Sequence, residues 1–200
     1  MQGAPPVLPD PDAQAIERCR AGEVDAFADV VERHQAAVYG TALRLLGDRE
    51  AALEVANTAF YKAYRALDSI DLDRPLRPWL LRIATNEALN HLRREGREAR
   101  QTLAGEAGRT ALESLVAERA DPAAGALARE QREAVQRALD ALPPAYRAVA
   151  VLRYLHDLSY AEIADQTGLP TNTVGVYLLR ARDQMRKALA AEGVSAHDLS

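Results

Sequence analysis

Apolar residues recur at helical spacing over most of the chain, and one long polar stretch interrupts them. A period of three to four residues predicts amphipathic helices rather than strands. Before the polar stretch, the predicted helices cover residues 13–21, 24–46, 50–67 and 78–94. The pattern therefore predicts a first compact helical domain over residues 12–97, preceded by a flexible, proline-containing tail over residues 1–11.

The polar stretch, residues 98–128, is rich in alanine and carries several glycines and charges of both signs. Such a composition, with few apolar residues, is typical of a flexible linker. A second helical domain is expected over residues 129–193, followed by a short tail over 194–200. Its predicted helices are 130–142, 145–155 and the two helices of the segment 159–187. The sequence thus predicts an all-α fold of two small helical domains joined by a linker.

The segment 159–187 carries the local signals of a helix-turn-helix. Ser159 and Glu162 have the spacing of a capping box, and Gly168 suits the left-handed residue that ends a helix. Two helices joined by so short a turn cross steeply, so the second can lie in a DNA major groove. An ordinary helical hairpin is the alternative. The caps, the turn and the basic residues near the end of the second helix together favour DNA binding.

The net charge of −4 is unusual for a protein that binds DNA by itself, because such proteins carry a strongly positive field. It indicates local basic patches, or a larger partner that supplies positive charge. The single cysteine, Cys19, excludes an intramolecular disulfide and favours a reducing cytoplasm. No apolar run approaches the length needed to span a membrane. We therefore expect a soluble, cytoplasmic protein.

The motifs do not favour an enzyme. The chain has no phosphate-binding loop, no nucleophile elbow and no obvious pair of catalytic carboxylates. Its histidines lack metal-site spacing among themselves or with Cys19. We expect no catalytic residue, no metal site and no cofactor.

Three stretches together carry a family resemblance: GDREAALEVANTAFYKAYRAL, RPLRPWLLRIATNEALNHLRR and ALPPAYRAVAVLRYLHDLSYAEIADQTGLPTNTV. The first two are similar to region 2, and the third to region 4, of sigma factors of the sigma-70 family, in the compact extracytoplasmic-function (ECF) group. The resemblance implies a subunit without an active site that gives the RNA polymerase core promoter recognition and DNA melting. It implies docking on the clamp helices and the flap of the core. The negative net charge fits this, since the core would complete the DNA-binding surface.

The resemblance implies that the helix 78–94 meets the −10 promoter element and that the loop 68–77 holds a base flipped out of the melted strand. Arginines there can contact phosphates, which adds affinity without sequence information, although a solvated face is the alternative. For Trp79 we favour a core anchor over stacking on DNA. The candidate residues on this side are Ser69, Ile70, Asp71, Leu72, Arg74, Arg77, Trp79, Arg82, Asn86, Asn90, Arg93 and Arg94.

By the same resemblance, the helix beginning at Thr171 reads the −35 element with its N-terminal residues. Gly175, Val176 and Tyr177 stand where related proteins often have basic or small polar residues, so we expect weak −35 recognition or a different element. Alternatively, Val176 and Tyr177 form an apolar face for a protein. The candidates are Thr171, Asn172, Thr173, Val176 and Tyr177 for bases, and Arg180, Arg182, Arg186 and Lys187 for phosphates.

The helix 50–67 corresponds to the face that docks on the polymerase core, and here the sequence departs from the family. Related proteins commonly carry an acidic run, whereas this chain keeps only Glu54. The docking candidates are Glu54, Asn57, Thr58 and Tyr61. Thr58 stands where the family usually has an acid. Phosphorylation of Thr58 by a Ser/Thr kinase would add about −1.5 to −2 charges and switch docking on, which is our hypothesis; a neutral surface threonine is the alternative.

Two other functions stay open. One is a helix-turn-helix regulator that acts without the core polymerase, with the first domain as a sensor or dimerisation domain. The other is a sigma-like protein used only for protein interaction, which the missing acidic run motivates. An anti-sigma factor held between the two domains is a further possible partner that the resemblance implies.

Overall fold

The computed structural model describes the chain over residues 10–101 and 122–191. Within these ranges the fold is all-α, with two helical domains, as the hydrophobic pattern predicts. Residues 1–9, 102–121 and 192–200 lie outside the described residues, so the predicted tails and most of the predicted linker are not part of this description. In the part of the chain that is described, no helix combines the length and the apolar composition needed to cross a membrane.

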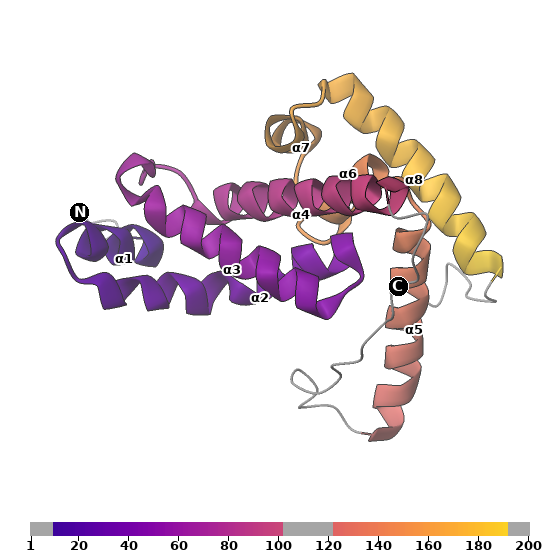
Figure 1. The fold of residues 1–200 in the computed structure, drawn as a ribbon, viewed down its shortest axis with the longest axis horizontal. Helices are drawn as coiled ribbons and strands as arrows, with labels where there is room; N and C mark the ends of the chain where they lie inside the picture. The colour runs from indigo at the N-terminus through magenta and orange to yellow at the C-terminus, as the bar shows by residue number, and fades with distance from the viewer. Residues whose placement is uncertain (1–9, 102–121, 192–200) are drawn as a thin grey trace, which may run out of the picture.

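The first domain is built on three long helices that pack on one another, with a shorter helix at one end (Figure 1). Its elements are α1 (Pro11–Arg20), the 3-10 turn η1 (Val24–Ala26), α2 (Phe27–Leu46), α3 (Arg49–Arg65), the 3-10 turn η2 (Leu67–Ser69) and α4 (Leu76–Gln101). Ile16, Val30 and Leu80 are completely buried at the centre. Their burial explains the helical period of apolar residues that the sequence displays.

The second domain consists of α5 (Pro122–Asp140), α6 (Pro144–Tyr154), α7 (Tyr160–Thr167) and α8 (Thr171–Ala191). Val149, Ile163 and Val174 form its buried core. The predicted caps of the helix-turn-helix are confirmed: Ser159 and Glu162 make both bonds of a capping box, and Gly168 has a φ of 70° at the end of α7. These local signals place α7 and α8 where the sequence predicts them.

Two helices are longer than their predicted ranges. Helix α4 begins at Leu76 rather than Pro78 and continues to Gln101 rather than Arg94. Helix α5 begins at Pro122 rather than residue 130. A proline in the first turn does not end a helix, and the many alanine, glutamate and arginine residues here offset the weak helix propensity of the glycines. The domain boundaries themselves remain a prediction.

The two domains pack directly against each other, which the sequence did not indicate. Helix α2 contacts α5 and α6, and α4 contacts α6 and α7. Figure 1 shows α4 crossing the molecule with α7 on one side of it. One buried apolar cluster spans both domains and consists of Ala42, Leu45, Ala52, Val55, Ala88, Leu139, Leu142, Ala148, Ala150, Val151 and Ala181.

Candidate nucleic-acid and polymerase interface

The loop between η2 and α4 is held in place by Arg20 of α1. The guanidinium of Arg20 donates to the carbonyl oxygens of Leu67 and Ile70, at 2.7 Å each from Nη2. Hydrogen bonds from a charged donor are stronger than neutral ones. No local signal in the sequence links Arg20 to this loop, which lies about fifty residues further along the chain.

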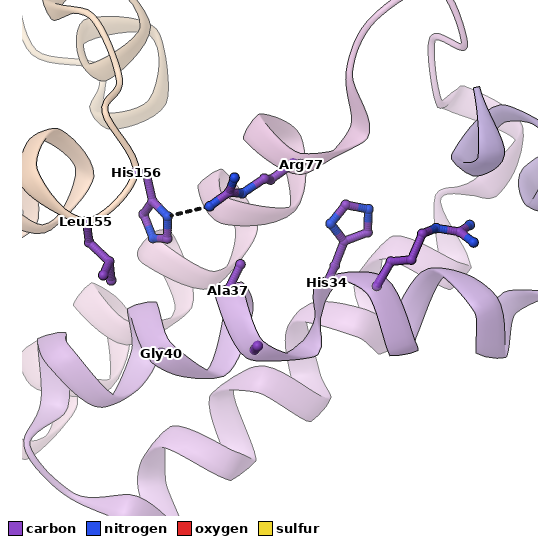
Figure 2. Close-up of a pocket in the computed structure, with 8 residues that line it drawn as sticks. His34, Ala37, Gly40, Arg77, Leu155 and His156 are labelled. Atoms are coloured by element: carbon purple, nitrogen blue, oxygen red, sulfur yellow. Dashed lines mark hydrogen bonds between the residues drawn. The ribbon is translucent and has the colours of Figure 1, made fainter. Parts of the chain in front are cut away.

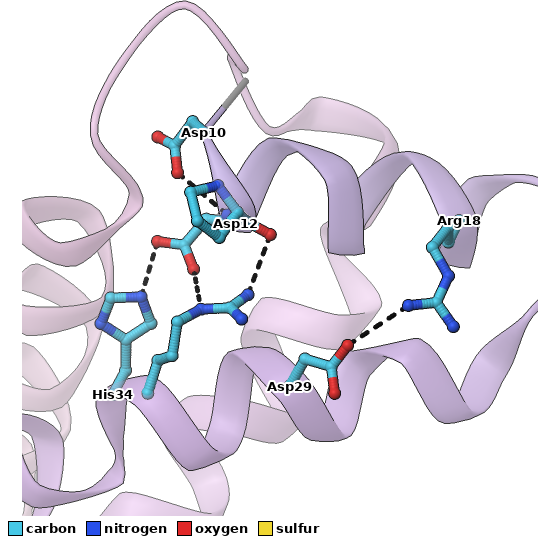
Figure 3. Close-up of polar contacts among 7 residues, drawn as sticks. Asp10, Asp12, Arg18, Asp29 and His34 are labelled. Atoms are coloured by element: carbon cyan, nitrogen blue, oxygen red, sulfur yellow. Dashed lines mark hydrogen bonds and ion pairs between the residues drawn. The ribbon is translucent and has the colours of Figure 1, made fainter. Parts of the chain in front are cut away.

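Helix α1 is itself fixed to α2 by a small polar network (Figure 3). The carboxylate of Asp12 accepts from Nε of Arg33 at 2.8 Å and pairs with Nε2 of His34 at 2.7 Å. Asp10 caps the start of α1 through a bond from the Asp12 backbone amide. This network orients α1, and α1 in turn presents Arg20 to the loop.

Several −10 candidates come together in one cleft of about 620 Å³ between this loop, the start of α4, and α7 of the second domain. The candidates that line it are Ser69, Ile70, Asp71, Arg74, Trp79 and Arg82. Across from them, α7 contributes Ala161, Glu162, Asp165 and Gln166. The structure therefore brings Ser69, Ile70, Asp71 and Arg74 together with Trp79 and Arg82, whereas the loop candidate Leu72 packs against the core of the first domain.

Trp79 has two environments at once. It packs against the core of the first domain together with Ile70 and Leu72, and it also lines the cleft. The aromatic ring is half-buried, so part of it anchors the loop and part of it is available to the cleft.

The remaining −10 candidates lie elsewhere. Arg77 points toward the second domain, where it donates to His156. Asn86, Asn90, Arg93 and Arg94 are exposed further along α4. Arg93 donates to the side-chain oxygen of Asn90 at 2.8 Å, so this pair presents one combined polar surface.

The −35 candidates all lie on α8. Thr171 and Asn172 are exposed at its start, and Val176 is 45% exposed. Tyr177 packs its ring on Tyr146 with 4.6 Å between centroids, while Arg180 donates to the Tyr146 hydroxyl at 2.9 Å. Arg182 is exposed, and Arg186 and Lys187 pair with Asp183 at 2.8 Å each.

The docking candidates lie on one helix, α3. Glu54, Asn57 and Tyr61 are exposed, and Thr58 is half-buried. Leu53, on the same helix, is a large apolar residue that is 54% exposed. Leu53 and Tyr61 are eight residues apart, which places them about 80° apart around the helix, within one broad face. The sequence gives no sign that Leu53 is exposed, because a leucine at helical spacing fits the pattern of a buried face.

Comparisons with known proteins agree with this geometry. The family described as Sigma-70 region 2 matches residues 30–98, and Sigma-70, region 4 matches residues 132–185. The chain is 34% identical to the ECF RNA polymerase sigma factor SigW of Bacillus subtilis (strain 168), over 87% of this chain and 94% of that protein. It is 36% identical to the ECF RNA polymerase sigma-E factor of Escherichia coli (strain K12), over 86% of this chain and 91% of that protein.

Solved structures give the same fold. The sigma factor RpoE in complex with the anti-sigma factor NepR, from Bartonella quintana, has a TM-score of 0.65 at 21% identity, covering 83% of this chain and 98% of that one. CnrH in complex with the cytosolic domain of CnrY has a TM-score of 0.63 at 26% identity, covering 91% and 99%. The chain belongs to the ECF sigma factors of the sigma-70 family, which are transcription initiation factors and not enzymes.

Proposed function

We propose that this chain is the promoter-specificity subunit of an RNA polymerase, with its first domain acting as region 2 and its second as region 4. The observation that carries the proposal is that one chain holds both the cleft of Trp79 and Arg82 and a capped helix-turn-helix. A regulator that acts alone would need only the second of these.

Region 2 would bind the −10 element through α4 and the loop before it. Arg74, Arg77, Arg82, Arg93 and Arg94 would contact phosphates, while Asn86 and Asn90 would reach base edges or sugars. Ser69, Ile70, Asp71 and Leu72 would form the pocket for a flipped base. Flipping costs a few kcal/mol, which contacts in the pocket offset.

Region 4 would bind the −35 element through the exposed start of α8. Thr171, Asn172 and Thr173 would face base edges, and Val176 could pack on a thymine methyl group. Tyr177 would contribute least, because its ring is already engaged with Tyr146. Arg180, Arg182, Arg186 and Lys187 would contact phosphates along the same helix.

Helix α3 would dock on the clamp helices of the core polymerase by packing more than by charge. Leu53 and Tyr61 present exposed apolar surface there, and Glu54 is the one acidic candidate. A docking face with few charges associates slowly, since electrostatic attraction mainly raises the association rate. Either apolar packing alone is enough for docking on the core polymerase, or a modification of the chain supplies the missing negative charge.

We further propose that phosphorylation of Thr58 supplies that charge. Thr58 is partly accessible on α3, and Lys62, four residues further along, is positioned to approach a phosphate there. In the unmodified chain, Lys62 is paired with Glu87 at 2.6 Å. The kinase would be a second partner, beside the polymerase core and promoter DNA.

An anti-sigma factor is another partner that we propose, since the RpoE chain that shares this fold was solved in complex with NepR. The anti-sigma factor would keep the protein from the core until a signal releases it. Loss of core binding when the anti-sigma factor is added, measured by size-exclusion chromatography, would support this assignment.

Transcription in vitro with purified core polymerase tests the main proposal. On a genomic library, specific transcripts should require both the core and this chain, while the chain alone should not bind an operator as a dimer. Transcription that does not depend on this chain, or binding of the chain by itself to a palindromic operator, would favour a helix-turn-helix regulator that acts without the core polymerase.

The Thr58 proposal is tested in the same assay with measured affinity for the core. Thr58→Asp should bind the core more tightly than wild type, and Thr58→Ala should bind as wild type does without kinase. Gln35→Glu adds one negative charge at an exposed position of α2 and serves as the control for net charge. Equal core affinity for all of these proteins would contradict gating while leaving the sigma role intact.

A further inference from the structure

A cavity of about 570 Å³ lies between α2, the start of α4 and the residues that follow α6. It is lined by Arg33, His34, Ala36, Ala37, Gly40, Arg77, Leu155 and His156. It shares no lining residue with the cleft of Trp79 and Arg82. Figure 2 shows Leu155 and His156 on the side opposite α2, with Arg77 beside His156. The volume falls within the ~300–1,000 Å³ of pockets that hold small molecules.

The wall of the cavity that α2 forms consists largely of small residues. Ala36, Ala37 and Gly40 present at most one methyl group each. A Cβ atom added at Gly40 would meet nothing within 4 Å, so the space beside this glycine is open. Leu155 lines the opposite side, and its side chain is 45% exposed. Together these residues form an apolar surface that suits the hydrocarbon part of a ligand.

The polar part of the cavity centres on Arg77, whose hydrogen-bond partner is a neutral histidine. The Thr41 hydroxyl donates its single proton to the carbonyl of Ala37 at 2.7 Å, so it accepts from Nε2 of His156 at 2.6 Å. Nδ1 of His156 then accepts from Nη2 of Arg77 at 3.3 Å. Because the acceptor is an uncharged ring nitrogen, this bond leaves the charge of the guanidinium uncompensated.

Positive charge exceeds negative charge around the cavity. Of the lining residues, Arg33 and Arg77 are cationic and none is acidic. Asp12 lies nearby, but its carboxylate is already paired with both Arg33 and His34. Among the carboxylates that the structure describes, none forms an ion pair with Arg77. The cavity therefore holds a guanidinium that is able to bind an anion.

The backbone beside the cavity is strained. Asp157 has a φ of 54° and is the one residue other than glycine with a positive φ in the described part of the chain. It directly follows Leu155 and His156, which the second domain contributes to the cavity. Conformations of this kind are uncommon and cluster at functional sites. Burial, and then the Arg77 charge, lower the pKa of His156 to about 4, and the Asp157 charge opposes this only in part, as expected for a positive potential.

We propose that this cavity binds a small organic anion, whose carboxylate or phosphate pairs with Arg77 and whose apolar part lies against Gly40 and Leu155. A guanidinium binds either group through two parallel hydrogen bonds. A neutral molecule would leave the Arg77 charge unmatched, and an inorganic ion would leave the apolar surface uncovered. The site goes beyond the function proposed above and does not depend on it, so its test needs neither polymerase nor DNA.

Four probes separate the chemistry of the ligand in titrations of the full chain followed by NMR. Phenyl phosphate and benzoate carry an anionic group on an apolar ring, inorganic phosphate carries the charge alone, and benzyl alcohol carries the ring alone. At least one of the two ring anions should bind roughly tenfold or more tightly than inorganic phosphate and benzyl alcohol. The tighter ring anion assigns the ligand to phosphate esters or to carboxylates. Equal affinity for inorganic phosphate would reduce the site to adventitious ion binding and overturn the proposal.

Two substitutions remove the two parts of the site. Arg77→Gln removes the charge and should weaken binding of the ring anion by at least roughly tenfold. Gly40→Leu fills the cavity from α2 with Arg77 in place and should abolish binding, while leucine is a better helix former than glycine. Arg65→Gln is the matched control for charge, because Arg65 is exposed on α3 and does not line the cavity. Its affinity should equal that of wild type.

Nuclear Overhauser effects locate the bound probe, with far-UV circular dichroism recorded to confirm that each variant is folded. Protons of the phenyl ring should show contacts to the methyl groups of Leu155 in wild type and in Arg65→Gln. Absence of binding, wild-type affinity in Arg77→Gln or Gly40→Leu, or contacts only to residues outside the cavity would overturn the proposal. Core-dependent transcription tests the sigma function separately, so that either result can fail while the other stands.

Discussion

Gly175 occupies the recognition helix without a backbone reason to be glycine. A side chain there would meet only the Tyr160 ring, at 3.5 Å, which is ordinary van der Waals contact. Alanine is a better helix former by up to ~1 kcal/mol. We therefore predict that Gly175→Ala stabilises the protein by up to ~1 kcal/mol, measured as a higher midpoint in thermal unfolding followed by circular dichroism.

The matched control for this prediction is Gly168→Ala at the end of α7. Gly168 has a φ of 70°, a backbone conformation that costs other residues roughly 1 kcal/mol or more. The same substitution should therefore destabilise the protein at this site. If Gly175→Ala lowers the unfolding midpoint as Gly168→Ala does, the prediction is contradicted. Gly175 would then have a structural role in α8 other than its effect on helix propensity.

At the scale of elements, the loop before α4 depends on α1. Arg20 makes bonds to the carbonyls of Leu67 and Ile70, and hydrogen bonds from a charged group contribute roughly 1.5–3 kcal/mol. Arg20→Gln should therefore release the loop, raising hydrogen exchange of the backbone amides of residues 67–74 by at least roughly tenfold.

Arg18→Gln is the control for the loop. Arg18 lies on the same helix, but its side chain pairs with Glu23 and Asp29 at the surface and does not reach the loop. Its removal should leave exchange in residues 67–74 unchanged. Equal protection of the loop in both variants would mean that core packing of Ile70 and Leu72, rather than Arg20, holds it.

The two elements that we propose to bind DNA differ in how far the sequence predicts them. The helix-turn-helix is specified locally: Ser159, Glu162 and Gly168 act within a few residues of their own backbone, so their roles can be read directly from the chain. The loop before α4 is held by Arg20 and by Trp79, which packs on the core of the first domain. Such contacts depend on the tertiary fold, and no local spacing signals them.

At the scale of the whole molecule, the sequence predicts two helical domains but not their packing. The apolar residues that join them, such as Leu45 and Val151, have the same helical spacing as residues inside either domain. A hydrophobic pattern indicates which face is buried, not which partner buries it. Nothing in the sequence marks Arg147 either. Its side chain is buried, and its Nη1 donates to the carbonyl of Leu45 on α2 at 2.6 Å.

The packed arrangement of the two domains, called the closed state below, should depend on pH through His156. Nε2 of His156 lies 2.6 Å from Oγ1 of Thr41 on α2, and Nδ1 lies 3.3 Å from Nη2 of Arg77 on α4. Burial, and then the nearby Arg77 charge, lower the pKa of His156 from 6.5 to about 4 in the closed state, while Asp157 opposes this weakly. Thr41 of α2 faces the other ring nitrogen, and Arg33 and His34 of α2 line the same cavity. Every group here except Asp157 is neutral or basic, so the closed state resists a proton on His156.

The charge on His156 changes the stability of the closed state only over a limited range of pH. Above pH 6.5, His156 is neutral in both states and closure does not vary with pH. Between pH 6.5 and about 4, the open state binds a proton that the closed state excludes. Closure should therefore weaken by up to about tenfold per pH unit as the pH falls through this range, and Trp79 emission should shift to the red.

The variant His156→Gln tests whether this histidine is responsible, with far-UV circular dichroism recorded to exclude unfolding. Glutamine can donate to Thr41 and accept from Arg77, but it does not titrate. The pH dependence of Trp79 emission between pH 6.5 and 4 should therefore disappear while the helical signal persists. Persistence of the same pH profile in His156→Gln would show that another group causes it.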